Sequence, residues 1–345
     1  MDSLTQMLLG GAIAAVVAPA HHRRAALLAG AALGTLPDLD ALPIALLTDD
    51  PVLRMTLHRG ASHSLLVLPL VAVLLWWLFR QRNGRVAEAP VRWFWAIGLA
   101  LCTHPVLDAF TVYGTQLLWP LPSPPVMWSS VFIIDPLYTV WLLLACVAAW
   151  WWQQRLAAQR VLVAGLALST AYLGWSLLAK AQVDREAEQA LAAMGIEDAP
   201  RFSVPMPFNT LLWRVVAMTP GGYVEGFRSL VADQGPMTFR AYPSDVQALE
   251  DAAQVPAVRR LSWFTHGFLR ARASGGMLVL GDLRMGSEPD YVFAFAVARR
   301  GRGGWNAMAP RALDMERAPG ALLGETWNRI WEQPMRTQPA RPAPP

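Results

Sequence analysis

The fold is decided by Val131–Trp152, VFIIDPLYTVWLLLACVAAWWW, and by the apolar run that follows it, Val161–Ala179, VLVAGLALSTAYLGWSLLA. Each run is close to the roughly 20 residues that an α-helix needs to cross a lipid bilayer. A third run of this kind covers Leu65–Phe79. We therefore predict that the part of the chain before Lys180 is a membrane domain.

The composition supports a membrane protein and excludes several other classes. Hydrophobic residues make up 54% of the 345 residues and charged residues 16%, which is too apolar for two ordinary soluble domains. The net charge is +4, but the arginines are scattered or lie in short loops, so no nucleic-acid partner is predicted. Cys102 and Cys146 both fall in predicted helices, which leaves neither a disulfide framework nor a cysteine-based zinc site.

The apolar segments predict a multi-pass protein of the bacterial inner membrane. We predict six membrane helices, near residues 4–20, 25–47, 64–79, 93–118, 131–152 and 161–179. The loops after the first, third and fifth carry most of the arginines, whereas the two opposite loops carry Arg54 and Arg59. Because cytoplasmic loops are enriched in Lys and Arg, the arginine-rich side should be cytoplasmic. Everything after Lys180 is then extracytoplasmic.

Three short motifs place histidines beside carboxylates near the predicted outer face. They are PDLD (37–40), HRGASHS (58–64) and HPVLD (104–108). A carboxylate near the middle of a membrane helix costs roughly 2.5–3.5 kcal/mol on insertion scales, so Asp108 requires a partner. His104 and Asp108 are four residues apart and share one helix face. Asp38 and Asp40 are two apart, which places both on one face only in extended backbone, and Pro37 favours such a break.

These motifs predict a divalent-metal site at the outer face of the membrane. Its candidate ligands are Asp38, Asp40, His58, His63, His104 and Asp108. Nitrogen and oxygen ligands without sulfur suit zinc and also fit manganese or iron. The set could hold one ion fully, or two ions with open positions.

A metal site with an open position predicts hydrolysis by a metal-activated water that attacks an ester or phosphoester. Asp40 is the candidate general base, and Arg59 is placed to clamp a phosphate or carboxylate. The predicted position at the membrane face suggests a phospholipid or another lipid-linked substrate.

Each motif also has a structural alternative. His104 with Asp108 could be a buried ion pair, and Asp38 with Asp40 could cap a helix or end a span at the membrane interface. His58 and His63 could be loop residues, with Ser62 or Ser64 capping the third span. For the protein as a whole, the alternatives are a metal transporter or carrier without hydrolytic activity, and an assembly protein whose ion pairs hold no metal.

Other histidines and one further aspartate are predicted to lie outside the site. Asp135 before Pro136 has the pattern of a helix N-cap followed by a first-turn proline, which we prefer to a ligand role. His21 and His22 lie in an arginine-rich loop and should be solvated. His266 lies in a β-like segment, where a surface or core role is expected.

The motifs together resemble the YdjM-like family of membrane-bound metal-dependent hydrolases, in its long form with a C-terminal soluble domain. The resemblance covers about residues 1–140 and rests on MDSLTQ (1–6), PDLD (37–40), HRGASHSL (58–65), THPVLD (103–108), YGTQLLWP (113–120) and IDPL (134–137). Beyond Lys180 it rests only on NTLLWR (209–214) and GDLR (281–284).

The resemblance implies a divalent metal bound by the PDxD, HRxxSH and HxxxD residues, together with hydrolytic activity. The HxxxD element is similar to one in zinc-dependent phospholipase C, which is a helical enzyme. This chain has Gln6 where many members carry His, and Ser62 where Thr is more usual. We therefore leave Gln6 out of the predicted ligand set.

After about residue 200 the pattern predicts a small antiparallel sheet. Short β-type runs lie at residues 211–218, 222–230, 237–242, 260–271, 277–283 and 291–298, and glycine-containing turns separate several of them. The predicted fold class is thus a mainly α membrane protein, with a phospholipase C-like metal site and a β-rich soluble domain. The predicted division is a transmembrane metal-site domain (1–180), a linking helix (181–199), an extracytoplasmic β-rich domain (200–332) and a disordered tail (333–345). The β-rich domain is expected to cover the membrane site or to supply substrate to it.

Overall fold

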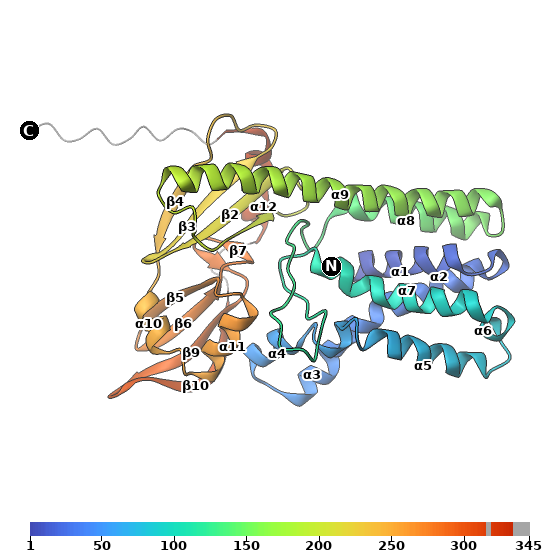
Figure 1. Cartoon of the computed structure of the whole chain (residues 1–345), viewed down its shortest axis with the longest axis horizontal. Coiled ribbons are helices and arrows are strands. Elements are labelled where there is room, and N and C mark those ends of the chain that lie inside the picture. Colours follow the sequence, from blue (N-terminus) through green and yellow to red (C-terminus); the bar gives the residue numbers. More distant parts are fainter. Residues whose placement is uncertain (315–318, 334–345) are drawn as a thin grey trace, which may run out of the picture.

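A computed structural model of the chain describes residues 1–314 and 319–333. The molecule is elongated, with a bundle of long helices at one end and two β-sheets at the other (Figure 1). The predicted combination of a helical N-terminal region and a β-rich C-terminal region is therefore confirmed.

The bundle consists of helices that run lengthwise beside one another. They are α1 (Ser3–Val17), α2 (Arg23–Thr35), α5 (Leu68–Arg80), α7 (Pro90–Ala109), α8 (Pro136–Trp152) and the first half of α9 (Leu156–Ala193). Helices α1 and α2 approach closely, because glycines replace larger side chains where they meet. A Cβ atom on Gly30 would lie 2.2 Å from the carbonyl oxygen of Gly10. Small residues of this kind allow helix backbones to pack tightly within a membrane.

The arginine-rich turns gather at one end of the bundle. The connections from α1 to α2, from α5 to α7 and from α8 to α9 all lie at the end remote from the β-sheets (Figure 1). Side-chain contacts join them, since Arg24 Nε donates to the carbonyl of Trp150 and His22 is bonded to Glu88 of α6 (Arg85–Glu88). The sequence expectation that these three loops share one side agrees with this arrangement.

Two helical stretches in the described part of the chain are long and apolar enough to cross a membrane. They are Ala20–Leu47 and Leu156–Ala193. A third is obtained if Pro51–His63 and Leu68–Arg80, which are bent by 56°, count as one span. Helices α1 and α8 are apolar but shorter, so six membrane passages remain a prediction.

Two predicted boundaries are wrong. The fourth segment was expected to reach residue 118, but α7 ends at Ala109, and the chain then forms a long loop that contains Gly114 with a φ of +102° and several prolines. A linking helix was expected over residues 181–199; the chain is helical there as far as Ala193, but as a continuation of the sixth span in one helix, α9. No glycine or proline interrupts the sequence after Gly174 of this helix, so nothing favours a break there.

Short helical turns connect the long helices near the β-sheets. They are η2 (Leu36–Asp40), α3 (Ala41–Leu47), α4 (Pro51–Leu57) and η3 (Ala61–His63); η1 (Ala20–His22) lies at the opposite end. The predicted capping role of Asp135 is confirmed, because its side chain accepts hydrogen bonds from the backbone N–H groups of Leu137 and Tyr138 at the start of α8.

The C-terminal region contains two four-stranded antiparallel sheets instead of the single small sheet that was expected. The first has the order β1 (Arg201–Pro205), β2 (Leu212–Thr219), β3 (Gly222–Ser229) and β4 (Phe239–Pro243). The second has the order β10 (Gly304–Leu313), β9 (Ala294–Gly301), β6 (Met277–Asp282) and β5 (Leu269–Ser274). A two-stranded pair, β7 (Gly286–Ser287) and β8 (Asp290–Tyr291), completes the strands described.

The run 260–271 was predicted as one strand, but it forms the end of α11 (Pro256–Phe264) and then β5. Pro256 stands at the first helical position, and Val258, Leu261 and Phe264 are buried at a three-residue spacing that suits one helix face. Two further helices are α10 (Val246–Asp251) and α12 (Pro319–Trp331). The predicted disordered tail falls, apart from Gln333, outside the described residues.

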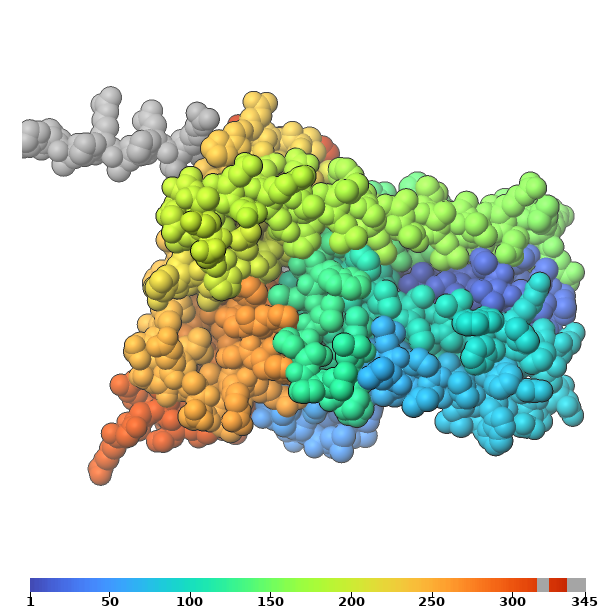
Figure 2. Space-filling view, viewed as in Figure 1, coloured from blue at the N-terminus to red at the C-terminus, as the bar shows by residue number. Residues whose placement is uncertain are grey.

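Both sheets lie against the helical region. The C-terminal half of α9 covers the first sheet, with Val183 and Ala187 packed near Trp213. The second sheet and α11 form a common core with Met55 and Tyr113 of the helical region. Figure 2 shows the loop after α7 filling the space between the bundle and the β-rich region. The β-rich region thus contacts the end of the bundle that carries η2 and η3.

Candidate metal centre

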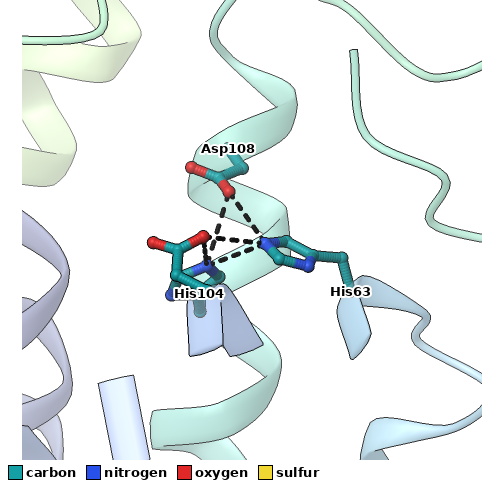
Figure 3. A group of neighbouring side chains, drawn as sticks. His63, His104 and Asp108 are labelled. Carbon is teal, nitrogen blue, oxygen red and sulfur yellow. Dashed lines mark hydrogen bonds and ion pairs between the residues drawn. The ribbon is translucent and has the colours of Figure 1, made fainter. Parts of the chain in front are cut away.

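The three predicted motifs converge at the end of the bundle nearest the sheets. Asp38 comes from η2, His63 from η3, and His104 and Asp108 from successive turns of α7. Their ligand atoms all lie within 4.8 Å of one another. Figure 3 shows His63 and His104 directed toward each other, with Asp108 above them.

The separations between these atoms are short and nearly equal. The Nε2 atoms of His63 and His104 are 3.1 Å apart. Asp38 Oδ1 lies 3.2 Å from His63 Nε2 and 3.4 Å from His104 Nε2. Asp108 Oδ2 lies 3.3 Å from His63 Nε2 and 3.4 Å from His104 Nε2. Two nitrogens and two oxygens therefore surround one point.

Hydrogen bonds on the far side of each ring fix which nitrogen carries the proton. His104 Nδ1 lies 2.6 Å from the carbonyl oxygen of Gly34, which can only accept, so Nδ1 donates. Ser62 donates its hydroxyl proton to Asp40, so its oxygen accepts from His63 Nδ1 at 3.0 Å. In the neutral rings both Nε2 atoms then carry lone pairs that face each other. Metal-ligating histidines are held in this way by a second layer of hydrogen bonds.

Asp108 is buried and divides its two oxygens between different partners. Its Oδ1 accepts a hydrogen bond from Gln6 Nε2 at 3.0 Å and contacts the amine of Met1. Its Oδ2, which faces the histidines, accepts no hydrogen bond from any described residue, although Arg59 Nε lies 3.2 Å away. A buried carboxylate oxygen without a donor is costly, and a cation between it and the histidines would remove that cost.

Sequence reasoning missed Gln6 as part of this centre. Its side chain is buried and also donates to the carbonyl of His104 at 3.2 Å. The signal was present, since Gln6 belongs to the MDSLTQ stretch that supports the family resemblance. It was set aside because the residue is not a histidine.

Asp40 and His58 do not join the four-atom cluster. Asp40 Oδ1 is 2.7 Å from His58 Nδ1, and Oδ2 accepts from Ser62 and from the backbone N–H of Arg59. The expectation of extended backbone at residues 38–40 is wrong, because η2 is a 3₁₀-helix. With three residues per turn, positions two apart point in different directions, so Asp38 reaches the cluster while Asp40 reaches the loop. Neither Ser62 nor Ser64 caps α5, whose N-cap is Val67.

Arg59 is held beside Asp108. It adopts a φ of +62°, a left-handed conformation that is uncommon for a residue with a side chain. Asp40 binds its N–H, and the N–H of Gln116 donates to its carbonyl at 3.0 Å. The guanidinium donates to Thr111 at 3.1 Å and lies 4.9 Å from the ring centre of Tyr113. The loop geometry thus places a buried positive charge against the cluster.

One side of the centre is open to solvent. The side chains of His63, His104 and Asp108 are fully buried, whereas that of Asp38 is 18% exposed and that of His58 is 26% exposed. Tyr113 lies beside both halves of the molecule, with its ring 5.8 Å from His58 and 5.5 Å from Phe264 of α11. The β-rich region therefore borders the centre.

A second histidine cluster lies at the other end of the bundle. His21 Nε2 and His22 Nε2 lie 3.2 and 2.9 Å from the two carboxylate oxygens of Glu88. The expectation that His22 is solvated is wrong, because it is 4% exposed. Trp93 Nε1 donates to His22 Nδ1, so His22 Nε2 holds the proton and donates it to Glu88. His22 thus accepts a hydrogen bond at Nδ1 and donates one from Nε2, so neither nitrogen offers a free lone pair to a metal ion. In the β-rich region, His266 bonds the carbonyl of Pro125 at 2.7 Å.

The fold and the centre together define a class of protein: a helical, membrane-type bundle that carries a buried His/Asp cluster and is followed by a β-rich region. The model of the family described as YdjM inner membrane protein matches residues 1–183, and the chain belongs to that family. The match includes all four residues of the cluster. No curated protein and no solved structure matches the chain.

Proposed function

We propose that the chain is a membrane-bound, metal-dependent hydrolase that acts on an ester or phosphoester substrate at the extracytoplasmic face of the inner membrane. The observation that carries the proposal is that the Nε2 atoms of His63 and His104 lie 3.1–3.4 Å from each other and from one carboxylate oxygen each of Asp38 and Asp108. All four atoms lie within 4.8 Å of one another. Without a cation among them, the two Nε2 lone pairs and the two carboxylate oxygens would repel one another, and the positive charges of Arg59 and of the Met1 amine both pair with Asp108 from outside the group.

The spacing of the donors suits a small divalent ion. The nitrogen–nitrogen and nitrogen–oxygen separations are close to the edge of about 3.3 Å in a tetrahedron whose centre lies about 2.0 Å from each corner, which is the usual distance from zinc to nitrogen or oxygen ligands. The mixture of imidazole and carboxylate favours zinc, with manganese or iron as alternatives. When bound, such an ion supplies Lewis acidity and lowers the pKa of water.

The surrounding residues can supply the remaining functions of a hydrolase. Asp40 holds His58 through Nδ1, which leaves His58 Nε2 to take up or release a proton at the exposed side of the centre. Arg59 holds a positive charge next to Asp108, where it can orient an anionic substrate group. In this proposal Asp40 acts through His58, which modifies its expected role as the base.

The membrane setting points to a lipid or lipid-linked substrate. We propose that the lengthwise helices of the bundle cross the inner membrane, with the arginine-rich turns in the cytoplasm. The centre then lies near the outer face and is bordered by the β-rich region. A metal carrier is the less favoured function, because the core between the centre and the arginine-rich end consists of apolar side chains such as Leu9, Ile97 and Leu101.

The first test is metal analysis of the purified protein. We expect one or two equivalents of a divalent metal in the wild type and in His21→Ala, an exposed histidine used as a matched control. The double variant His104→Ala with Asp108→Ala should contain none. A wild type without stoichiometric metal would overturn the proposal in favour of an assembly protein with ion pairs.

Hydrolysis then separates an enzyme from a carrier. Wild-type protein should cleave phosphoester or phospholipid probes, and this activity should be lost on chelation. Because removal of two buried residues can prevent folding, His58→Ala provides a second variant: it should keep the metal and lose most of the hydrolysis. Metal in the wild type and in His58→Ala, without hydrolysis of any probe by either, would favour the carrier.

A further inference from the structure

A basic cavity lies at the arginine-rich end of the bundle, far from the His/Asp centre. Its volume is about 430 Å³. Residues from the end of α1, the start of α2, the start of α7 and the start of α9 line it. The lining residues used below are Val17, Arg23, Arg92, Arg155, Leu156 and Gln159.

The charges around this cavity are uncompensated. Three guanidinium groups, from Arg23, Arg92 and Arg155, line it, and no carboxylate does. Within residues 1–314 and 319–333, no ion pair is found for any of the three. Three like charges around one hollow repel one another, and a bound anion would reverse that repulsion.

Arg23 supplies a separate indication of a ligand. It is 3% exposed and is held by the carbonyl of Gln153 and by Gln159 Oε1, the latter at 2.6 Å from Nη2. Its Nε is buried and has no hydrogen-bond partner among the described residues. Buried polar groups are paired in the great majority of cases, so a missing acceptor is expected at the cavity.

Two helix N-termini meet at the same place. Helix α2 begins at Arg23 and α9 at Leu156, and neither N-cap residue, His22 or Arg155, caps its helix with a side chain. The backbone N–H of Arg23 donates to the carbonyl of Ala20, and that of Ala158 donates to the carbonyl of Arg155. The positive ends of both helix dipoles still favour an anion at this place.

We propose that this cavity binds the phosphate headgroup of an anionic phospholipid from the cytoplasmic leaflet. Phosphate matches the bidentate geometry of arginine and accepts several hydrogen bonds at once. A lipid is favoured over free phosphate because apolar residues share the lining: Val17 is half-buried, and Leu156 is exposed at the rim. Anionic lipids are concentrated in the cytoplasmic leaflet, on the side that the arginine-rich turns predict.

The test uses full-length protein in detergent and in nanodiscs. Binding of phosphatidylglycerol is measured by native mass spectrometry and by titration, with phosphatidylcholine and inorganic phosphate as comparison probes. The main variant is Arg92→Gln with Arg155→Gln, because both side chains are exposed and their loss should not prevent folding. Arg160→Gln is the matched control, since Arg160 is an exposed arginine in the first turns of α9 and does not line the cavity.

We expect the double variant to bind phosphatidylglycerol about tenfold or more weakly, since each arginine near a lipid surface contributes about a factor of five. Arg160→Gln should stay within about twofold of wild type on the same scale. Equal losses in both variants would overturn the proposal, because they would indicate general attraction to the basic end. Inorganic phosphate that binds as tightly as the lipid would overturn the assignment to a phospholipid.

Discussion

The Nε2 atoms of His63 and His104 face each other at 3.1 Å, while both rings use Nδ1 to donate hydrogen bonds away from the centre. Two neutral imidazoles do not adopt this arrangement without a cation, because both facing atoms are acceptors. The hydroxyl oxygen of Ser62 and the carbonyl oxygen of Gly34 accept these hydrogen bonds and so fix the tautomers of the two rings. Substitutions at Ser62 and Gly34 therefore test the metal site without removing a ligand.

Ser62→Ala should weaken metal binding without removing a ligand. The variant loses the oxygen that accepts from His63 Nδ1 and the proton that goes to Asp40, so the tautomer of His63 is no longer fixed. Loss of such an outer partner typically costs about 10- to 100-fold in metal affinity. Competition with a chromophoric chelator measures the change. Thr103→Val is the control, since that hydroxyl bonds only the carbonyl of Leu99 within its own helix, and equal affinities for the two variants would contradict the tautomer assignment.

Gly34→Ala should disturb the same centre from the other side. An added Cβ would lie 2.3 Å from the carbonyl oxygen of Gln6, so α1 and α2 must separate. The carbonyl that holds His104 would shift with them. We expect a loss of about 1–3 kcal/mol in stability, as for other overpacked cores, together with weaker metal retention. Thermal unfolding in detergent measures the first and metal analysis the second.

Gly98→Ala is the matched control for that substitution. A Cβ at residue 98 of α7 meets nothing within 4 Å, and alanine is a better helix former than glycine. Its melting temperature should equal or exceed that of the wild type. If both alanine variants unfold alike, close packing of α1 against α2 does not support the centre.

The buried ion pair of the β-rich region should be essential for its stability but not for the metal. Arg284 is bonded to Asp282 through both Nε and Nη2, at 2.9 and 2.8 Å, and neither side chain is exposed. Asp282→Asn leaves the guanidinium without its counter-charge, which costs about 3–5 kcal/mol in comparable buried pairs. Glu250→Gln, an exposed change in the same region, should have little effect. Unfolding followed by tryptophan fluorescence and metal content together test this, and parallel loss of metal would show that the two regions fold as one unit.

The sequence identified the residues of the His/Asp cluster, but it predicted the backbone geometry around them less well. Spacing alone paired His104 with Asp108, because a four-residue interval on a helix needs no tertiary information. The divergence of Asp38 and Asp40 could not be predicted, since it depends on η2 being a 3₁₀ turn that continues from α2. The placement of Gln6 against Asp108 also depends on tertiary contact, because their helices, α1 and α7, are far apart in sequence.

The fold was predicted at the level of regions and less well at boundaries. Apolar runs located the helices of the bundle, and alternating runs with glycine turns located most strands. The end of the sixth span was taken as a helix boundary because the sequence changes from apolar to charged residues near residue 180. The residues on both sides of that point favour a helix, so α9 continues through it. The helical part of 260–271 was mistaken for strand, because a short amphipathic stretch with aromatic residues fits both periods until its partners are known.

The relay at the arginine-rich end should make stability depend on pH. Hydrogen bonds from His22 and then from His21 hold the pKa of Glu88 below its usual value of 4.5. A carboxyl whose pKa is lowered on folding stabilises the folded state above its unfolded pKa, and this contribution is lost as the pH falls through the folded pKa. Glu88→Gln should therefore melt below the wild type at pH 7, and the two curves should converge as the pH is lowered below about 4.5. Glu197→Gln, at an exposed glutamate of the β-rich end without an ion pair among the described residues, should follow the wild type at every pH. A constant gap between Glu88→Gln and the wild type from pH 7 to pH 3 would mean that the carboxylate charge contributes nothing and that only its packing against His22 matters.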